Sequence, residues 1–275
     1  MDLRTAITQG STLLEQGGIA VPRLTAEVLL AHAIGKERTY FYAHPEEELT
    51  ELGWIHYGRY LHQRLKRMPT QYITKKQEFW GRDFLVTPDV LIPRPETEHL
   101  IESVLAECSK VQRLVDVGTG SGAIAVTLAL ELKAEVFATD ISMPALSIAR
   151  VNAGKYGSPV QFVNCDLCSV FAPESLDLVV SNPPYVPKNA HLEPEIRDFE
   201  PFLALFAGQN GLEIYPRLIE QAFCVLKPGG RFLAEMGIHQ SDALQQMLTH
   251  GWTGVHTIAD LAGIPRIISA QRTNV

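Results

Sequence analysis

The sequence predicts an α/β protein in which a doubly wound, Rossmann-like sheet follows a small helical domain. Two observations carry this prediction. Up to about residue 67, apolar residues recur three and four positions apart, as they do on the buried face of a helix. From about Glu96 onward, short apolar runs alternate with helical segments, which is typical of a parallel sheet with helices on both faces. We therefore expect a small all-α domain at residues 1–70 and a larger α/β domain at residues 87–275.

The N-terminal domain is expected to contain three main helices. Leu3 and Ile7 begin an apolar stripe that indicates the first helix. The second opens at Pro22 and ends at Gly35, since proline is favoured in the first turn of a helix and glycine just after its end. The third runs from about residue 47 to residue 65. No cluster of chemically reactive side chains occurs here, so we assign this domain to packing or docking.

Residues 71–86 link the two domains. Their sequence, QYITKKQEFWGRDFLV, alternates around a polar middle and predicts a β-hairpin. The seven strands of the sheet are then expected at Arg113–Val117, Glu135–Asp140, Val160–Cys165, Leu176–Ser181, Arg231–Glu235, 254–258 and 266–270. Ligands of such sheets bind at the carboxyl ends of the strands, so polar residues at these ends are the candidate functional residues.

The composition indicates a cytoplasmic protein. Hydrophobic residues make up 46% and charged residues 20% of the chain, which is the balance of a globular protein. The formal net charge of −7 argues against stable binding to nucleic-acid phosphates. The first residues lack the pattern of a signal peptide, and no apolar run approaches the roughly 18 residues of a membrane-spanning helix. We therefore expect neither a nucleic acid nor a membrane as a stable partner.

The cysteines do not indicate a metal site. Cys165 and Cys168 have the spacing of a CxxC pair, but no second pair or nearby histidine completes a zinc site. Cys165 also falls at the end of an expected strand. We interpret this pair as small buried side chains and expect no metal cofactor.

Residues 114–123, LVDVGTGSGA, predict a strand, a glycine-rich turn and the start of a helix. Glycines let the backbone turn tightly and approach a ligand without obstruction by a Cβ atom. The candidate cofactor contacts in this loop are Gly118, Thr119, Gly120, Ser121 and Gly122. The loop alone does not identify its ligand, because its spacing, with Ala123 at the third place, also fits the dinucleotide fingerprint.

Three aspartates near the ends of successive strands favour S-adenosylmethionine (SAM) over a dinucleotide. Asp140 ends the second strand, where its carboxylate can accept hydrogen bonds from ribose hydroxyls. Asp116 lies two residues before the first glycine, and an acid there suits a cationic ligand better than a pyrophosphate. Asp166 follows the third strand and can accept a hydrogen bond from an adenine amino group. A turn would explain one such aspartate, but three beside a glycine loop indicate a nucleoside site.

The segment Asn182-Pro183-Pro184-Tyr185 follows the fourth strand and offers acceptors for an –NH2 group. Its prolines carry no N–H and keep the backbone extended and stiff. Asn182 Oδ1 and the Pro183 carbonyl can together accept both hydrogens of a planar amide or base, against which the ring of Tyr185 can lie. We take Asn182, Pro183 and Tyr185 as catalytic residues, and Pro184 as a further substrate contact. Catalysis would then depend on positioning, which can contribute on the order of 7–11 kcal/mol.

The loop from Asp116 to Gly122, combined with the Asn-Pro-Pro-Tyr segment, resembles the class I amino-methyltransferases. That group includes adenine-N6 DNA methyltransferases and protein glutamine methyltransferases. Further stretches are similar to one family within it, HemK/PrmC: VLIPRPETE at 90–98, EFWG at 78–81, NGL at 210–212 and PGG at 228–230. With the helical N-terminal part, these stretches cover almost the whole chain. The VLIPRPETE string is highly specific, whereas a GxGxG loop is not.

This resemblance implies a class I SAM-dependent methyltransferase fold and N5-methylation of the glutamine in the Gly-Gly-Gln motif of class I peptide chain release factors. It also implies that the glycine loop and Asp140 bind SAM and that Leu167 borders the adenine. Asn182 is expected to lie close to the methyl donor as well as to the substrate. The helical domain is expected to help dock the release factor.

Two charged residues within VLIPRPETE have an open role. Arg94 and Glu96 either line the substrate groove or form a buried pair that fixes the loop before the first helix of the sheet domain. The sequence also departs from the family pattern at Lys75, where a glycine is usual, and at Leu167, where the family sometimes has an aromatic residue.

Three other functions remain open on the sequence. A glutamine methyltransferase of a ribosomal protein would share the whole catalytic half and differ in docking. An adenine-N6 methyltransferase of nucleic acid would share the Asn-Pro-Pro-Tyr segment, but the chain lacks an evident basic recognition domain. A non-catalytic nucleotide-binding or NAD-linked protein would leave that segment without a role.

Overall fold

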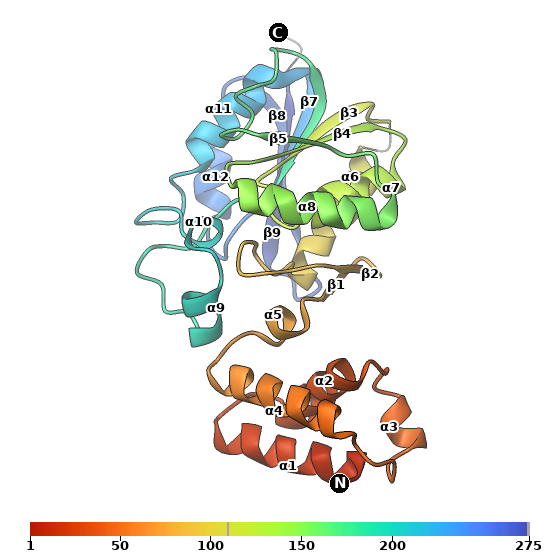
Figure 1. The fold of residues 1–275 in the computed structure, drawn as a ribbon. Coiled ribbons are helices and arrows are strands. Elements are labelled where there is room, and N and C mark those ends of the chain that lie inside the picture. Colours follow the sequence, from red (N-terminus) through yellow and green to blue (C-terminus); the bar gives the residue numbers. More distant parts are fainter. Residues whose placement is uncertain (109, 274–275) are drawn as a thin grey trace. The chain divides into compact units, whose positions relative to one another are not determined.

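The computed structural model describes residues 1–108 and 110–273, and the chain divides into two units. The first comprises Met1–Lys76 together with Leu192–Phe199, and the second comprises Gln77–His191 together with Glu200–Val275. Figure 1 shows the helical first unit and the α/β second unit as ribbons. The first unit thus includes a short segment from the middle of the sheet domain's sequence.

The first unit is helical, as the sequence predicts. Its N-terminal part contains α1 (Leu3–Gln16), α2 (Pro22–Ile34), α3 (Tyr40–Ala43), α4 (Glu51–Leu65) and α5 (Thr70–Thr74). Asp2 caps α1 by accepting a hydrogen bond from the Thr5 amide at 2.7 Å, and Gly35 ends α2 in a left-handed conformation. Leu14, Leu29 and Tyr57 lie in the core that α1, α2 and α4 share.

Helix α4 begins later than expected. The Thr50 hydroxyl accepts a hydrogen bond from the Gly53 amide at 3.1 Å and so caps the helix at this point. The preceding residues are held in another way, because the Leu49 amide donates to the Met1 carbonyl and the Glu47 carbonyl accepts from the Leu3 amide. Their backbone groups are therefore used outside the helix.

The linking hairpin is shorter than predicted. It consists of β1 (Gln77–Phe79) and β2 (Arg82–Phe84), and the residues before it form helix α5 instead of a strand. Tyr72 and Ile73 are both buried, although a strand would direct adjacent side chains to opposite faces. Lys75 ends α5 in a left-handed conformation with φ of 56°, which explains why glycine suits this position.

A short helix, α9 (Pro194–Phe199), belongs to the first unit. Within it, Glu195 accepts a hydrogen bond from Arg64 Nη2 at 3.1 Å and from Arg67 Nη1 at 3.4 Å. The sequence did not predict this contact, because the charged partners are far apart along the chain.

Seven strands form one sheet in the second unit, in the order β5-β4-β3-β6-β7-β9-β8. Their bounds are β3 (Arg113–Val117), β4 (Glu135–Asp140), β5 (Gln161–Asn164), β6 (Leu176–Ser181), β7 (Leu226–Glu235), β8 (Trp252–Ala259) and β9 (Pro265–Arg272). Strands β3 to β7 are parallel, whereas β9 is antiparallel to both β7 and β8. The predicted Rossmann-like sheet is confirmed, and its order reverses between β3 and β6, where such sheets bind ligands.

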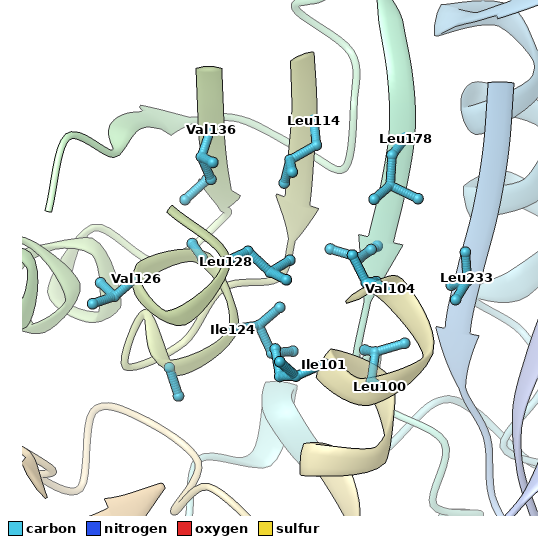
Figure 2. Close-up of a cluster of buried hydrophobic side chains, with 14 of the residues drawn as sticks. Leu100, Ile101, Val104, Leu114, Ile124, Val126, Leu128, Val136, Leu178 and Leu233 are labelled. Atoms are coloured by element: carbon cyan, nitrogen blue, oxygen red, sulfur yellow. The ribbon is translucent and has the colours of Figure 1, made fainter. Parts of the chain in front are cut away.

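Helices cover both faces of the sheet, because its central strands are apolar on both sides. Cores on the two faces include α6 (Glu98–Glu107), α7 (Ala123–Glu131) and α8 (Met143–Tyr156) on one, and α11 (Tyr215–Val225) and α12 (Ser241–Met247) on the other. Neighbouring residues of a strand face opposite cores, as Leu178 and Val179 do. Figure 2 shows Leu114, Val136, Leu178 and Leu233, from four adjacent strands, with residues of α6 and α7.

Two short helical segments complete the second unit, the 3-10 helix η1 (Pro95–Thr97) and α10 (Phe202–Leu205). Within residues 1–108 and 110–273, no helix combines the length and the apolar character needed to cross a membrane.

Candidate active site

A cavity of about 590 Å³ opens at the carboxyl ends of the parallel strands, in the size range of small-molecule sites. Residues from four strand ends line it: Gly118 and Gly120 after β3, Asp140 at β4, Asp166 and Leu167 after β5, and Asn182, Pro183 and Pro184 after β6. The fold therefore brings the predicted cofactor-binding residues and the Asn-Pro-Pro-Tyr segment to one place.

The glycine loop forms a tight turn beside this cavity. Gly118, Gly120 and Gly122 have φ of 73°, 54° and 82°, a region that glycine enters without steric cost. Of the five loop residues predicted to contact the cofactor, Gly118 and Gly120 line the cavity. Thr119 and Ser121 are buried and do not line it, nor does Gly122. Contact of these three residues with the cofactor stays a prediction.

Asp140 ties the glycine loop to the end of β4. Its Oδ2 accepts a hydrogen bond from the Gly120 amide at 2.9 Å, and its Oδ1 accepts one from the Ser142 amide at 2.8 Å. Burial raises the pKa of this carboxyl, although both hydrogen bonds oppose that shift. A carboxylate oxygen has more than one acceptor site, so Asp140 can still accept a hydrogen bond from a ligand.

Asp116 supports the loop from within the protein. Its side chain is fully buried, and Oδ2 accepts hydrogen bonds from Thr119 Oγ1 at 2.6 Å and from the Ala125 amide at 3.2 Å. Oδ1 has no partner in the described part of the chain. Burial raises the pKa of Asp116 to about 7, despite these hydrogen bonds. Asp116 thus connects the loop to the start of α7 and does not line the cavity.

Asp166 has a partner that the sequence did not predict. Its Oδ2 accepts a hydrogen bond from Arg217 Nη2 of α11, and both residues line the cavity. About half of each side chain is exposed, so solvent weakens this ion pair. Any hydrogen bond that Asp166 accepts from a ligand must form beside Arg217. Leu167 follows with a positive φ of 53°, which turns the chain at the cavity wall.

The Asn182 side chain is fixed through its nitrogen. Asn182 Nδ2 donates to Thr97 Oγ1 at 3.1 Å, and the Thr97 hydroxyl donates in turn to Glu235 Oε2 at 2.6 Å. No described residue donates to Asn182 Oδ1 or to the Pro183 carbonyl, so both acceptors predicted for the substrate remain available.

Tyr185 is held at its side chain and at its backbone. Its hydroxyl donates to Glu235 Oε1 at 3.1 Å, and its carbonyl accepts a hydrogen bond from Gln240 Nε2 at 3.0 Å. Glu235 itself is 2% exposed, and burial raises its pKa against the hydrogen bonds that lower it. The buried Glu235 carboxylate is therefore linked to both ends of the Asn-Pro-Pro-Tyr segment, to Tyr185 directly and to Asn182 through Thr97.

Arg94 and Glu96 do not form a pair with each other. Arg94 Nη2 donates to Glu200 Oε1 at 2.5 Å, and Glu200 Oε2 also accepts from the Ile92 amide at 3.2 Å. Glu96 is exposed. Of the two alternatives left open by the sequence, the Arg94–Glu96 pair is therefore wrong, because the partner of Arg94 comes from a distant part of the chain. Arg94 instead anchors the segment that leads into α10, and neither residue lines the cavity.

Comparison with known proteins decides the family. The chain matches the PrmC N-terminal domain at residues 5–74 and the methyltransferase small domain at residues 95–197. It is 43% identical to the release factor glutamine methyltransferase of Koribacter versatilis over 99% of both chains. The chain belongs to the release factor glutamine methyltransferase family. The enzyme of that name from Bacillus subtilis is 41% identical over 89% of this chain and 90% of its own.

Solved structures of other proteins confirm the fold of this family member. A methyltransferase from Pyrococcus furiosus superposes with a TM-score of 0.54 at 19% identity, over 74% of this chain and 94% of its own. The 16S rRNA N2 G1207 methyltransferase of Thermus thermophilus gives 0.52 at 17% identity, over 72% of this chain and 49% of its own. At such identity the likeness concerns the fold alone, which is that of class I SAM-dependent methyltransferases.

Sequence reasoning did not identify four residues that support the site: Thr97, Arg217, Glu235 and Gln240. Glu235 had a detectable signal, since it is an acid at the carboxyl end of an apolar strand. Thr97 lies within VLIPRPETE, where the charged Arg94 and Glu96 are the stronger signal. A single sequence offers no signal that Gln240 meets Tyr185, because that contact depends on the fold.

The predicted lack of a metal site stays a prediction. Cys168 is buried and Cys165 lies at the cavity wall, and both are free thiols. Burial raises the pKa of Cys168 to about 12, so its thiol stays protonated and unreactive. No group of three or more metal-binding side chains occurs among the residues that the structure describes.

Proposed function

We propose that the protein transfers a methyl group from SAM to the side-chain amide nitrogen (N5) of the glutamine in the Gly-Gly-Gln motif of class I peptide chain release factors. Relatives named release factor glutamine methyltransferase match almost the whole chain and support this function. The observation that carries it is that Asn182 and Pro183 line the same cavity as the glycine loop. Acceptors for an amide and a site for a nucleoside donor are therefore adjacent.

The chemistry of the cavity suits SAM better than a dinucleotide. The residues that line it are mostly apolar, and its acids include Asp140. Arg217 is the basic residue of the lining among the described residues, and it is already paired with Asp166. A pyrophosphate would thus meet an acid and no unpaired cation, whereas the cationic and uncharged groups of SAM face no such penalty. We assign SAM to Gly118, Gly120, Asp140, Leu167 and Asn182.

The protein's own residues act on the glutamine by positioning it. Asn182 Oδ1 and the Pro183 carbonyl would accept the two amide hydrogens, and the ring of Tyr185 would lie against the amide plane. When bound, SAM supplies a sulfonium methyl group that is reactive enough to make a strong base unnecessary. Holding both reactants in line is the contribution that these residues make to the rate.

We assign docking of the release factor to the helical domain at residues 1–70. Helix α4 exposes large apolar side chains to solvent, with Leu52 at 63% and Ile55 at 57% exposure. Such side chains are typical of surfaces that contact other proteins. A net charge of −7 favours a protein over a nucleic acid as the partner. Because release factors act in translation, we place the enzyme in the cytoplasm.

Intact-mass measurement tests the substrate. The protein with SAM should add one methyl group to a class I release factor, and none to a factor whose motif glutamine is replaced by alanine. A ribosomal protein and an adenine-containing oligonucleotide serve as competing substrates and should stay unmodified. Methylation of the alanine-substituted factor would show that the proposed site is wrong.

The Asn182→Ala variant tests the role of the amide acceptor. Turnover should fall by about 100-fold, because misplacing the amide by roughly 1 Å is enough for such a loss. SAM affinity, measured by calorimetry, should change much less, since the other strand ends remain intact. Unchanged turnover would remove Asn182 from the mechanism.

A further inference from the structure

Thr97 and Glu235 set the direction of the hydrogen bond that holds the Asn182 side chain. Thr97 Oγ1 donates its single hydrogen to Glu235 Oε2 at 2.6 Å, and the Tyr185 hydroxyl donates its hydrogen to Glu235 Oε1 at 3.1 Å. With Glu235 ionised, both of its carboxylate oxygens act as acceptors. Because its single hydrogen is donated to Glu235, Thr97 Oγ1 can only accept a hydrogen bond from Asn182.

This direction decides which end of the Asn182 amide faces the cavity. Thr97 Oγ1 accepts from Asn182 Nδ2 at 3.1 Å, so Oδ1 points away from Thr97. If the amide turned over, Oδ1 would meet the lone pairs of Thr97 Oγ1, and Nδ2 would meet the substrate –NH2 group. Thr97 is 4% and Glu235 2% exposed, so water cannot easily replace the lost hydrogen bonds.

Gln240 holds the other end of the Asn-Pro-Pro-Tyr segment, at the Tyr185 backbone. Its Nε2 donates to the carbonyls of Tyr185 at 3.0 Å and Gly211 at 3.1 Å, while its Oε1 accepts from the Gly237 amide at 2.8 Å. The Tyr185 carbonyl is therefore occupied. Asn182 Oδ1 and the Pro183 carbonyl, by contrast, have no donor among the described residues, and both residues line the cavity.

We propose that Thr97 and Glu235 are positioning residues that make the site select a neutral amide over a carboxylate, by holding Asn182 with Oδ1 toward the substrate. The proposal rests on the proposed function, since it assumes that the Asn182 side chain receives the glutamine amide. A glutamine presents two hydrogens to the two acceptors. A glutamate in its place presents only carboxylate oxygens. These oxygens would face Asn182 Oδ1 and the Pro183 carbonyl with no hydrogen between them.

Removing the Thr97 hydroxyl frees the Asn182 amide to turn. The Thr97→Val variant keeps the side-chain shape and loses the acceptor for Nδ2, so kcat should fall by about 10-fold to 100-fold. Thr97→Ser keeps the hydroxyl and should restore kcat to within about threefold of wild type. SAM affinity should change little in either variant, because Thr97 does not line the cavity.

A matched control separates this role from general packing. Thr127 in α7 is also fully buried, but its hydroxyl has no hydrogen-bond partner in the described part of the chain. Thr127→Val makes the same chemical change in the same unit and should leave kcat unchanged. A loss of kcat in Thr127→Val equal to that in Thr97→Val would overturn the proposal.

The ratio of binding affinities for glutamine and glutamate substrates separates positioning from stability. A purely structural role of Thr97 would not change this ratio. Without SAM, wild type should bind a release factor with its motif glutamine at least about tenfold more tightly than the same factor with glutamate there. Docking contacts are common to both factors and cancel in this ratio. In Thr97→Val the ratio should shrink toward one.

Glu235→Gln provides a second variant of the same shape. When its –NH2 group faces Thr97, it donates to Thr97 Oγ1 and leaves the Thr97 hydrogen free for Asn182 Oδ1, so the ratio should again shrink. If wild type adds no methyl group to the release factor, the proposed function fails whatever the variants do. If wild type methylates the factor while Thr97→Val and Glu235→Gln keep both the rate and the ratio, the positioning role alone is refuted.

Discussion

Gly211→Ala should disable the site from a position outside the cavity. A Cβ atom on Gly211 would lie 2.2 Å from the Tyr185 carbonyl oxygen and 3.0 Å from Gln240 Nε2. Real Cβ atoms have ordinary contacts only from 3.4 Å outward, so the Tyr185 carbonyl must move by about 1 Å. Tyr185 directly follows the two prolines, and their stiffness passes this shift to the Pro183 carbonyl.

Two separate costs are expected from this substitution. Gly211 has φ of 77°, so any side chain there strains the backbone by about 1–2 kcal/mol. That strain alone lowers the melting temperature by a few degrees in a protein of this size. The displacement of roughly 1 Å at the substrate amide adds a loss of about 100-fold in kcat.

Gly157→Ala is the matched control. Gly157 ends α8 with φ of 60°, and a Cβ atom there meets no described heavy atom within 4 Å. This variant should have a similar loss in melting temperature and an almost unchanged kcat. The assay is single-turnover methylation of a release factor, together with thermal unfolding of each variant. Equal kcat in the two variants would refute the link between Gly211 and the site.

Three further outcomes follow from the loop, the strand end and the linking segment. Burial raises the pKa of Asp116 from 3.8 to about 7, so the folded chain keeps a proton that the unfolded chain loses between about pH 4 and pH 7. The free energy of unfolding should fall as pH rises through that window, by at most about 4 kcal/mol, and Asp116→Asn should flatten this dependence in urea titrations. Asp140→Asn should weaken SAM binding about tenfold or more in calorimetry, because its –NH2 group must face the amide of Gly120 or Ser142. Lys75→Gly should raise the free energy of unfolding by up to about 1 kcal/mol, because Lys75 has φ of 56°.

Each of these outcomes has a direct contradiction. An Asp116→Asn variant with the same pH dependence as wild type would mean that another group titrates. Wild-type SAM affinity in Asp140→Asn would remove this carboxylate from the cofactor site. A less stable Lys75→Gly variant would show that freedom gained by the unfolded chain outweighs the relieved strain.

Much of the fold was predictable because it depends on local patterns. The strands β3, β4 and β6 have the expected bounds, since each is a short apolar run that ends in a polar residue or a turn. The prediction failed where local patterns compete. In residues 71–74 the alternation suggested a strand, but these residues belong to helix α5, which buries both Tyr72 and Ile73.

The sequence by itself determined the sheet, the glycine loop and the presence of an Asn-Pro-Pro-Tyr segment after the fourth strand. Strand periodicity, turn residues and proline geometry are properties of short stretches, so they can be recognised without a fold. Only the tertiary structure decided which side chains support these motifs. Thr97 and Glu235 meet although they are 138 positions apart, and Arg94 pairs with Glu200 and not with Glu96. Buried polar groups need partners wherever the packed chain supplies them, and their distance along the sequence does not matter.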